Sequence, residues 1–181
     1  MTSPNFDHVP VLGQRVRDLL APALQRKGAT FVDANVGLGG HMSIVLEAFP
    51  NVRAIGIDRD EDALQLCRER FASNASRVEL VKAVNDELSR ILIGLDIDWV
   101  DGVLFDSGVS SMQIDNRERG FTYAHDAQLD MRMDSSGELS AAVILNEYPE
   151  AAIARILHIY GERSEEHTSE LQSPCNLVCR L

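Results

Sequence analysis

Four short apolar runs, rich in β-branched residues, recur along the first 106 residues, and segments with a helical pattern separate them. Runs of this length and composition are typical of strands buried on both faces of a parallel sheet. The sequence therefore predicts strands at residues 29–35 (ATFVDAN), 52–58 (VRAIGID), 77–84 (RVELVKAV) and 99–106 (WVDGVLFD).

The segments beside these runs place apolar residues at helical spacing, as Leu64, Cys67 and Phe71 do between the second and third runs. Helices are predicted at residues 14–24, 41–49 and 61–71. Alternation of strands and helices with short links favours right-handed βαβ units. We expect an α/β fold with a doubly wound parallel sheet.

The pattern changes after Ser111. Residues 112–134 show no clean period, although Leu129–Asp134 alternates apolar and charged positions and is expected to be extended. Two short helices are predicted at residues 140–145 and 149–160, with Pro149 in a first turn.

The last 18 residues, SEEHTSELQSPCNLVCRL, do not continue this rhythm. They resemble the peptide obtained when sequencing-adapter DNA is read as coding sequence, so we interpret residues 164–181 as a non-native tail. The alternative is an ordinary polar tail. His167, Cys175 and Cys179 are too loosely spaced to indicate a metal site, and no metal is expected.

Composition favours a soluble protein: hydrophobic residues make up 45% of 181 and charged residues 25%. No apolar run approaches the roughly 20 residues that span a bilayer, and the N-terminus shows no secretory signal. The cysteine count of three is odd, which indicates reduced thiols and not a disulfide framework. We therefore expect a cytoplasmic protein, and the lack of a long apolar run predicts that it does not enter a membrane. The formal charge of −11 is unusual for a nucleic-acid binder, so an RNA-binding surface would have to be local or lie elsewhere.

Glycines crowd the junction after the first predicted strand, at Gly37, Gly39 and Gly40. Such a turn lets a ligand approach the backbone closely, although a purely structural turn is the alternative. The nicotinamide fingerprint G-x-G-x-x-G fails because its third position is Met42, and no Gly-Lys-Ser/Thr follows. Asp33 also disfavours phosphate and suits a cation, such as the amino or sulfonium end of S-adenosylmethionine.

Two more acids end predicted strands. Asp58 lies about 20 residues after the glycine loop, where a carboxylate can accept hydrogen bonds from ribose hydroxyls. Its alternative role is to cap the helix that begins near Glu61. Asp106 ends the fourth strand. Ligands of open α/β sheets bind outside the carboxyl ends of the strands, so Asp33, Asp58 and Asp106 are expected to face one crevice.

The order of motifs resembles one bacterial family. HVPVL (8–12), VDANVGLGGH (32–41), IGIDRD (55–60), LFDSGVSSMQID (104–115), RERGF (117–121) and LDMRMD (129–134) are similar to the small-subunit ribosomal RNA cytidine N4-methyltransferases of the MraW or RsmH type. The resemblance covers residues 8–163 and is far more specific than a lone glycine loop.

The resemblance implies a class I, Rossmann-like methyltransferase fold that uses S-adenosyl-L-methionine. It implies that Gly39, Gly40 and His41 line the methionine end of the cofactor and that Asp58 holds the ribose. It places Asn85 near the adenine, and Asp106 and Gln113 where they close the site.

The implied partner is 16S ribosomal RNA of the small subunit, methylated at a cytidine of the decoding centre; a homodimer is left open. Residues 1–112 would form the N-terminal part of the methyltransferase domain, and residues 113–163 the start of an inserted, partly helical substrate-recognition region. The family is longer, so the sheet would be incomplete. Asn35, Met42, Asn85 and Ser107 depart from its usual residues.

We expect direct in-line methyl transfer to an exposed or flipped cytidine, driven by positioning, with no metal or covalent nucleophile. Asp106 could orient either cofactor or amine, and the catalytic residue stays unassigned. The alternatives are a non-catalytic fragment of the enzyme and a nicotinamide-dependent oxidoreductase.

Several residues carry more than one interpretation. His8 is interpreted as structural before catalytic. Trp99 is interpreted as a packing residue at a strand start. Arg117, Arg119 and Arg132 could equally meet RNA phosphate or pair with nearby acids.

Overall fold

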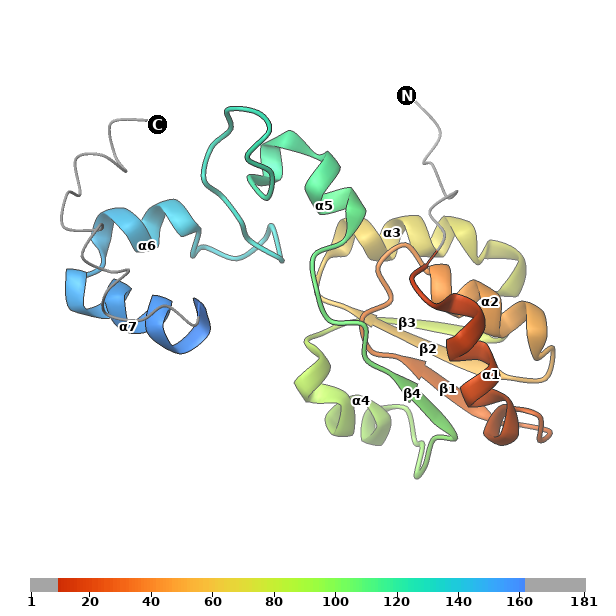
Figure 1. Cartoon of the computed structure of the whole chain (residues 1–181). Coiled ribbons are helices and arrows are strands. Elements are labelled where there is room, and N and C mark those ends of the chain that lie inside the picture. Colours follow the sequence, from red (N-terminus) through yellow and green to blue (C-terminus); the bar gives the residue numbers. More distant parts are fainter. Residues whose placement is uncertain (1–9, 162–181) are drawn as a thin grey trace. The chain divides into compact units, whose positions relative to one another are not determined.

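A computed structural model describes residues 10–161 of the chain. The chain divides into two compact units, before and after the link between Met112 and Gln113. Figure 1 shows the parallel sheet and its helices in the first unit, and the remaining helices in the second.

The first unit is built on four parallel strands in the order β3-β2-β1-β4. Pairing of β1 with both neighbours aligns Val32 with Ile55 of β2 and with Val103 of β4. All four predicted strands and their parallel arrangement are confirmed, with shorter bounds: β1 (Thr30–Asp33), β2 (Arg53–Asp58), β3 (Val78–Lys82) and β4 (Gly102–Leu104).

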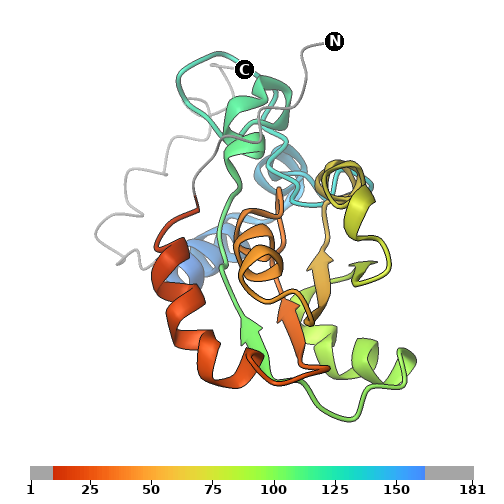
Figure 2. The ribbon, with the colours of Figure 1, turned by 90° about the vertical axis from the view of Figure 1, so that its right-hand side faces the viewer.

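Helices cover both faces of this sheet, which gives a three-layer α/β unit (Figure 2). The three predicted helices are α1 (Gly13–Leu24), α2 (Gly40–Ala48) and α3 (Glu61–Arg70), and they pack on one face. The other face is covered by α4 (Leu88–Gly94), which was not predicted. Short 3₁₀ turns, η1 (Ala72–Asn74) and η2 (Asn85–Glu87), flank β3.

Alternation of side chains along each strand supplies two apolar clusters. Phe31 faces α1 to α3, whereas its neighbour Val32 faces α4 together with Ile55 and Ile57. All four side chains are fully buried. Burial of each such side chain contributes about 1.5–3 kcal/mol before the loss of chain entropy is counted. The strand ends that carry Asp33 and Asp58 are therefore anchored in a packed core.

The expectation that Trp99 packs at a strand start is wrong. Its side chain is 69% exposed and lies before β4. The guanidinium of Arg26 lies 5.8 Å from the centre of its ring. Arg26 in turn donates two hydrogen bonds, of 2.6 and 2.7 Å, to the carboxylate of Asp101. Trp99 thus lies beneath a surface ion pair, because β4 begins three residues later than expected.

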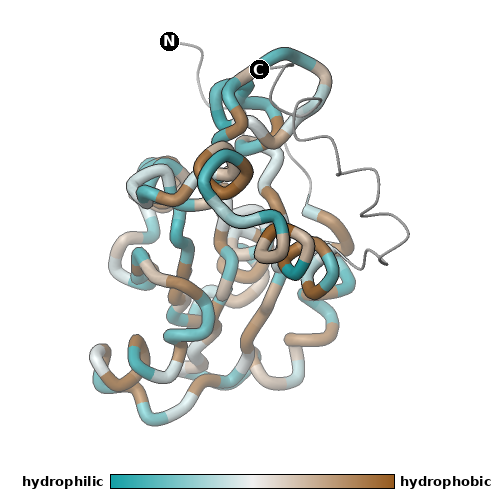
Figure 3. Tube along the Cα trace, turned by 90° about the vertical axis from the view of Figure 1, so that its left-hand side faces the viewer, coloured by the Kyte–Doolittle hydropathy of each residue, from teal (hydrophilic) through white to brown (hydrophobic). Residues whose placement is uncertain are grey.

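The division between the units falls within the short helix α5 (Ser111–Asp115). The second unit contains the short helix η3 (Arg117–Arg119) and the two predicted helices α6 (Ala141–Glu147) and α7 (Glu150–Gly161). Ser140 caps α6 by accepting a hydrogen bond from the backbone N–H of Val143 at 3.3 Å. Hydrophobic and hydrophilic residues follow one another at short intervals along these helices (Figure 3).

The expectation of an extended segment at Leu129–Asp134 is also wrong. Met131 adopts a left-handed conformation, with φ of 55°, and no strand forms there. The turn brings the Met131 N–H to the carbonyl of Arg119 at 3.0 Å. The alternating pattern therefore reflects charged groups that serve a polar network, described below, and not a half-buried strand.

None of the helices in the described part of the chain has the length and apolar character required to cross a membrane. The interpretation of residues 164–181 as a non-native tail concerns residues outside those the structure describes.

Candidate functional site

The glycine loop joins the end of β1 to the start of α2 and depends on glycine for conformation and for space. Gly37 and Gly39 have φ of 50° and 75°, which residues with a side chain rarely adopt. A Cβ atom on Gly39 would lie 2.5 Å from the Phe71 ring. Part of the glycine requirement is therefore packing of α3 against the loop, and not only access for a ligand.

Two side chains of α3 fasten this loop through its carbonyl groups. The Cys67 thiol donates to the Gly37 carbonyl at 3.1 Å, and Arg70 donates to the Leu38 carbonyl at 2.7 Å. Burial raises the pKa of Cys67 to about 12, so the thiol keeps its proton and remains a donor. Neither residue was predicted to contribute to the site; the sequence placed both only within the helix predicted at residues 61–71.

Asp58, at the end of β2, holds the loop through its backbone. The N–H of Gly37 donates to one carboxylate oxygen of Asp58 at 2.8 Å, and the N–H of Asp60 donates to the other at 2.9 Å. Burial raises the pKa of Asp58, and these two N–H groups oppose that rise. The cap of α3 is Asp60, which accepts from the Asp62 N–H, so Asp58 does not serve that role.

Asp33, at the end of β1, is almost completely buried, with 1% of its surface exposed. Burial raises its pKa to about 7, and the nearby charges of Asp106 and Asp58 act in the same direction. The N–H of Asn35, 3.4 Å from the carboxylate, opposes this rise. The three strand-end acids thus interact electrostatically, and a cation placed among them would favour the ionised form of Asp33.

His41 lies in the first turn of α2 and contacts two groups from other parts of the first unit. Its Nε2 lies 2.9 Å from the carbonyl oxygen of Val11, and its Nδ1 lies 3.5 Å from a carboxylate oxygen of Asp106. A carbonyl can only accept a hydrogen bond, so Nε2 carries a hydrogen. His41 is buried, whereas the side chain of Asp106 is 58% exposed.

Asn35 links two further loops that follow strands. Its side-chain oxygen accepts hydrogen bonds from Asn85 Nδ2, at 3.4 Å, and from Ser107 Oγ, at 3.3 Å. These residues follow β1, β3 and β4 respectively. Sequence reasoning named Asn85 as a site residue but missed its bond to Asn35, because the two residues lie 50 positions apart along the chain.

The structure thus gathers six of the seven predicted site residues in the first unit, at or just after the carboxyl ends of its strands: Gly39, Gly40, His41, Asp58, Asn85 and Asp106. The seventh, Gln113, is buried in α5 and belongs to the second unit. Its part in the site therefore stays a prediction.

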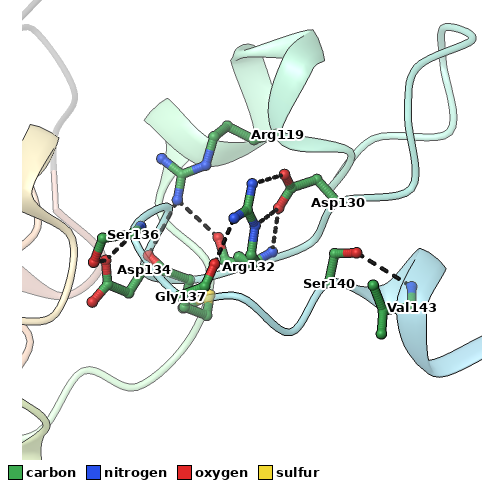
Figure 4. Close-up of polar contacts among 9 residues, drawn as sticks. Arg119, Asp130, Arg132, Asp134, Ser136, Gly137, Ser140 and Val143 are labelled. Carbon is green, nitrogen blue, oxygen red and sulfur yellow. Dashed lines mark hydrogen bonds and ion pairs between the residues drawn. The ribbon is translucent and has the colours of Figure 1, made fainter.

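Two of the three arginines considered for RNA binding are engaged within the second unit (Figure 4). Arg119 donates to the backbone carbonyls of Arg132, at 2.9 Å, and Met133, at 3.1 Å. Arg132 donates to both carboxylate oxygens of Asp130, at 2.8 and 2.6 Å, and to the Gly137 carbonyl. The hydrogen bonds with Arg132 lower the pKa of Asp130 to about 2. Arg117 is exposed.

Within residues 10–161 there is no group of three His, Cys, Asp or Glu side chains arranged to hold a metal ion. His8, His167, Cys175 and Cys179 lie outside these residues.

Comparison with known sequences gives consistent matches over most of the chain. The model of the MraW methylase family matches residues 5–169. A ribosomal RNA small subunit methyltransferase H of Thermobifida fusca is 53% identical over 160 residues, which cover 88% of this chain and 48% of that protein. The protein of the same name from Frankia alni is 58% identical over 156 residues, which cover 86% of this chain and 48% of that protein. The chain spans about half the length of these relatives.

Among solved structures, the chain is similar to an rRNA methylase from Streptococcus thermophilus, with 21% identity and a TM-score of 0.39. That similarity covers 46% of this chain and 49% of the other. It is also similar to the C-terminal domain of a precorrin-6Y C5,15-methyltransferase from Rhodobacter capsulatus, with 20% identity, a TM-score of 0.39 and coverage of 56% and 53%.

Proposed function

The chain belongs to the MraW methylase family, and from that premise we propose that it carries the cofactor-binding part of an RNA methyltransferase. The proposed enzyme transfers a methyl group from S-adenosyl-L-methionine to the exocyclic N4 amine of a cytidine in 16S ribosomal RNA, at the decoding centre. Its partner is the small ribosomal subunit, and its place is the cytoplasm. The names of relatives that cover most of this chain support the RNA substrate.

One observation carries the cofactor assignment: three carboxylates gather around a glycine loop at the carboxyl ends of parallel strands. Crevices outside strand ends are the usual ligand sites of open α/β sheets. S-adenosylmethionine combines a ribose, which needs hydrogen-bond acceptors, with ammonium and sulfonium cations, which need negative charge. Asp58 supplies the acceptors, and Asp33 and Asp106 supply the negative charge.

Asp58 can hold the ribose without releasing the loop. Each of its oxygens already accepts one backbone N–H, from Gly37 or Asp60, and a carboxylate oxygen has a second lone pair for a hydroxyl group. The ribose would then join an existing network whose geometry the core fixes. Gly39, Gly40 and His41 form the adjoining surface for the methionine end.

Asp106 is the exposed acid of the three and is available to either the cofactor or the attacking amine. The bound cofactor supplies an electrophilic methyl group, and the amine must be held in line with it and must lose a proton. A carboxylate accepting a hydrogen bond from the amine would orient it. The Nδ1 atom of His41 lies 3.5 Å from that carboxylate. Gln113 is proposed to close the site.

Residues 1–112 are proposed as the N-terminal part of the methyltransferase domain and residues 113–163 as the start of a substrate-recognition region. Of the three arginines considered for RNA binding, Arg119 and Arg132 are engaged within the second unit, which leaves Arg117 as the exposed one that is available to RNA.

The nicotinamide alternative is not favoured. The position that requires the third glycine is Met42, whose side chain is fully buried between α2 and the sheet. A Cβ on Gly56 of β2 would lie 2.8 Å from the Met42 methyl group, so this side chain occupies the space that the fingerprint keeps clear for close packing of helix and strand.

Equilibrium titration of the purified chain with S-adenosylhomocysteine, with NAD as the comparison ligand, tests the proposal. We expect saturable binding of S-adenosylhomocysteine alone, weakened at least about 10-fold in Asp58→Ala, because two ribose hydrogen bonds are lost. Asp98→Ala removes an exposed acid of equal charge and should leave affinity unchanged. Binding of NAD alone would overturn the assignment.

Methyl transfer to small-subunit RNA is a separate measurement, made with labelled S-adenosylmethionine. Incorporation at a cytidine N4, lost in Asp58→Ala, supports the full activity. Cofactor binding without any transfer would identify the chain as a non-catalytic, binding part of the enzyme.

A further inference from the structure

A strained turn at residues 10–13 leads into α1. The Gly13 N–H donates to the Pro10 carbonyl at 3.2 Å, and Leu12, the third residue of the turn, has φ of 54° and ψ of 22°. Turns with a positive φ at this position usually carry glycine or asparagine, because a larger side chain crowds the backbone. Strained residues persist only where the surrounding structure holds them, and they gather at functional sites.

Packing against α2 and one hydrogen bond hold this turn in place. A Cβ on Gly13 would lie 2.5 Å from a side chain of α2, and a Cβ on Gly40 would lie 3.3 Å from the Pro10 ring. The two glycines therefore let the turn lie directly on the start of α2. His41 donates from Nε2 to the Val11 carbonyl at 2.9 Å, which ties the centre of the turn to the same helix.

The two central side chains of the turn stay outside this packing. Val11 is 73% exposed and Leu12 is 71% exposed. His41 also brings the turn to Asp106, because its other ring nitrogen, Nδ1, lies 3.5 Å from that carboxylate. The apolar turn and the exposed acid of the candidate site thus contact opposite nitrogens of one imidazole ring.

This combination suits a nucleobase that carries an exocyclic amine. The charges of Asp33, Asp58 and Asp106 disfavour phosphate at this edge of the sheet, so RNA would approach it through a base and not through its backbone. A base taken out of its stack loses its neighbours, and apolar side chains against its face replace them. Cytosine offers an amine at C4 to a carboxylate, whereas uracil has a carbonyl oxygen there.

We propose that Val11 and Leu12 form an apolar platform for the target cytosine, beside the carboxylate of Asp106 that accepts a hydrogen bond from its amine. The inference rests on the proposed function, because it concerns the cytidine that the enzyme would methylate. It also accounts for the strain at Leu12. Glycine would suit the backbone of this turn better, but it would offer the base no apolar surface.

The experiment is a nuclear magnetic resonance titration of the full chain, labelled with ¹³C in the methyl groups of valine and leucine. The chain is saturated with S-adenosylhomocysteine, and a short single-stranded oligocytidylate or oligouridylate is added. We expect saturable shifts of the Val11 and Leu12 methyl signals with oligocytidylate. Oligouridylate should bind at least about 10-fold more weakly, because its C4 carbonyl oxygen would face the carboxylate of Asp106.

Leu12→Gly separates the base contact from the stability of the turn. The substitution relieves the strained φ, so the temperature of unfolding should not fall. The affinity for oligocytidylate should fall about 5- to 10-fold, because a partly buried leucine contact is lost. Leu19→Ala, at an exposed leucine of α1, is the matched control and should leave this affinity unchanged. Equal effects of the two substitutions on affinity would refute the platform.

The remaining outcomes separate this inference from the proposed function. Val11 and Leu12 signals that stay unmoved while oligocytidylate shifts other methyl groups would overturn the inference alone. Shifts produced fully by S-adenosylhomocysteine, or by raising the concentration of the chain, would assign the turn to the cofactor or to a second copy and overturn it too. Absence of oligocytidylate binding to the loaded chain would do the same. Absence of S-adenosylhomocysteine binding would overturn the proposed function, and this inference with it.

Discussion

The first unit of this protein is stabilised by a different kind of interaction from the second. In the first, strands and helices enclose two clusters of fully buried apolar side chains. In the second, the only buried residues within the described part are Gln113 and Arg119, and both are polar. Six of the seven candidate cofactor-site residues belong to the first unit. Side chains that must keep a fixed geometry are thus placed on strand ends anchored in a core, whereas the second unit depends on a few directed hydrogen bonds.

The largest effect is expected from a deletion in the apolar core. Ile57→Ala removes a fully buried side chain between β2 and α4 and should lower the free energy of unfolding by about 2–5 kcal/mol. Ile93→Ala, at a position 79% exposed on α4, should change it by less than about 0.5 kcal/mol. Urea denaturation of both variants measures the difference, and equal losses would refute a core-based account of the first unit.

Gly39 of the glycine loop and Gly28, in the link between α1 and β1, form a matched pair of substitutions. Gly28 and Gly39 have nearly the same φ, 76° and 75°, but a Cβ on Gly28 meets nothing within 4 Å, whereas one on Gly39 meets Phe71. Gly28→Ala should cost about 1–2 kcal/mol of stability through backbone strain alone. Gly39→Ala should cost at least about 1 kcal/mol more through overpacking. Thermal unfolding compares them, and similar losses would show that the Phe71 contact is unimportant.

Buried acids of the first unit should make it less stable as pH rises. The pKa of Asp33 is raised to about 7 from an ordinary value of 3.8, so the stabilisation is fully present below pH 3.8 and is lost as pH rises through 7. The asparagine of Asp33→Asn cannot ionise, so this substitution should abolish the decline. At pH 8 it should raise the free energy of unfolding by at most about 4 kcal/mol relative to the unaltered chain. Asp98→Asn, an exposed control, should keep it. Stability curves that stay identical with and without Asp33 would contradict the assignment.

The second unit should instead become less stable as pH falls, and this is the smallest of the expected effects on stability. The pKa of Asp130 is lowered to about 2, so its ion pair with Arg132 contributes above pH 3.8 and is lost as pH falls through 2. Because the pair is partly exposed, Asp130→Asn should cost less than about 1 kcal/mol. Hydrogen exchange of residues 119–137 measures this locally. Acid-independent protection there would argue against a polar scaffold.

The four strands and the helices α1, α2 and α3, which pack on one face of the sheet, could be predicted because their apolar periodicity is strong. Asp33 and Asp58 could be placed at strand ends for the same reason. The helix α4 was not predicted, although Leu88, Ile91, Leu92 and Leu95 have helical spacing, because a helix of only seven residues gives a weak periodic signal. Trp99 was misplaced because an apolar residue beside a strand pattern does not reveal where pairing begins.

The polar contacts could not be predicted from the sequence, because they join residues that are distant along the chain. Neither the bonds of Asn35 with Asn85 and Ser107 nor the contact of His41 with Val11 follows from spacing. The alternation at Leu129–Asp134 was misleading, since Asp130 and Arg132 bind each other in a turn. Sequence patterns report burial well and report directed polar bonds poorly.

The most direct test of the central claim is a nuclear magnetic resonance titration of the ¹⁵N-labelled chain with S-adenosylhomocysteine. The account predicts saturable shifts of backbone amides at Gly37–His41, Asp58 and Asn85, in the first unit. It predicts that amides of the arginine network, from Arg119 to Gly137, shift far less. Saturable shifts confined to that network, or none at the strand ends at millimolar ligand, would contradict a cofactor site built on the sheet.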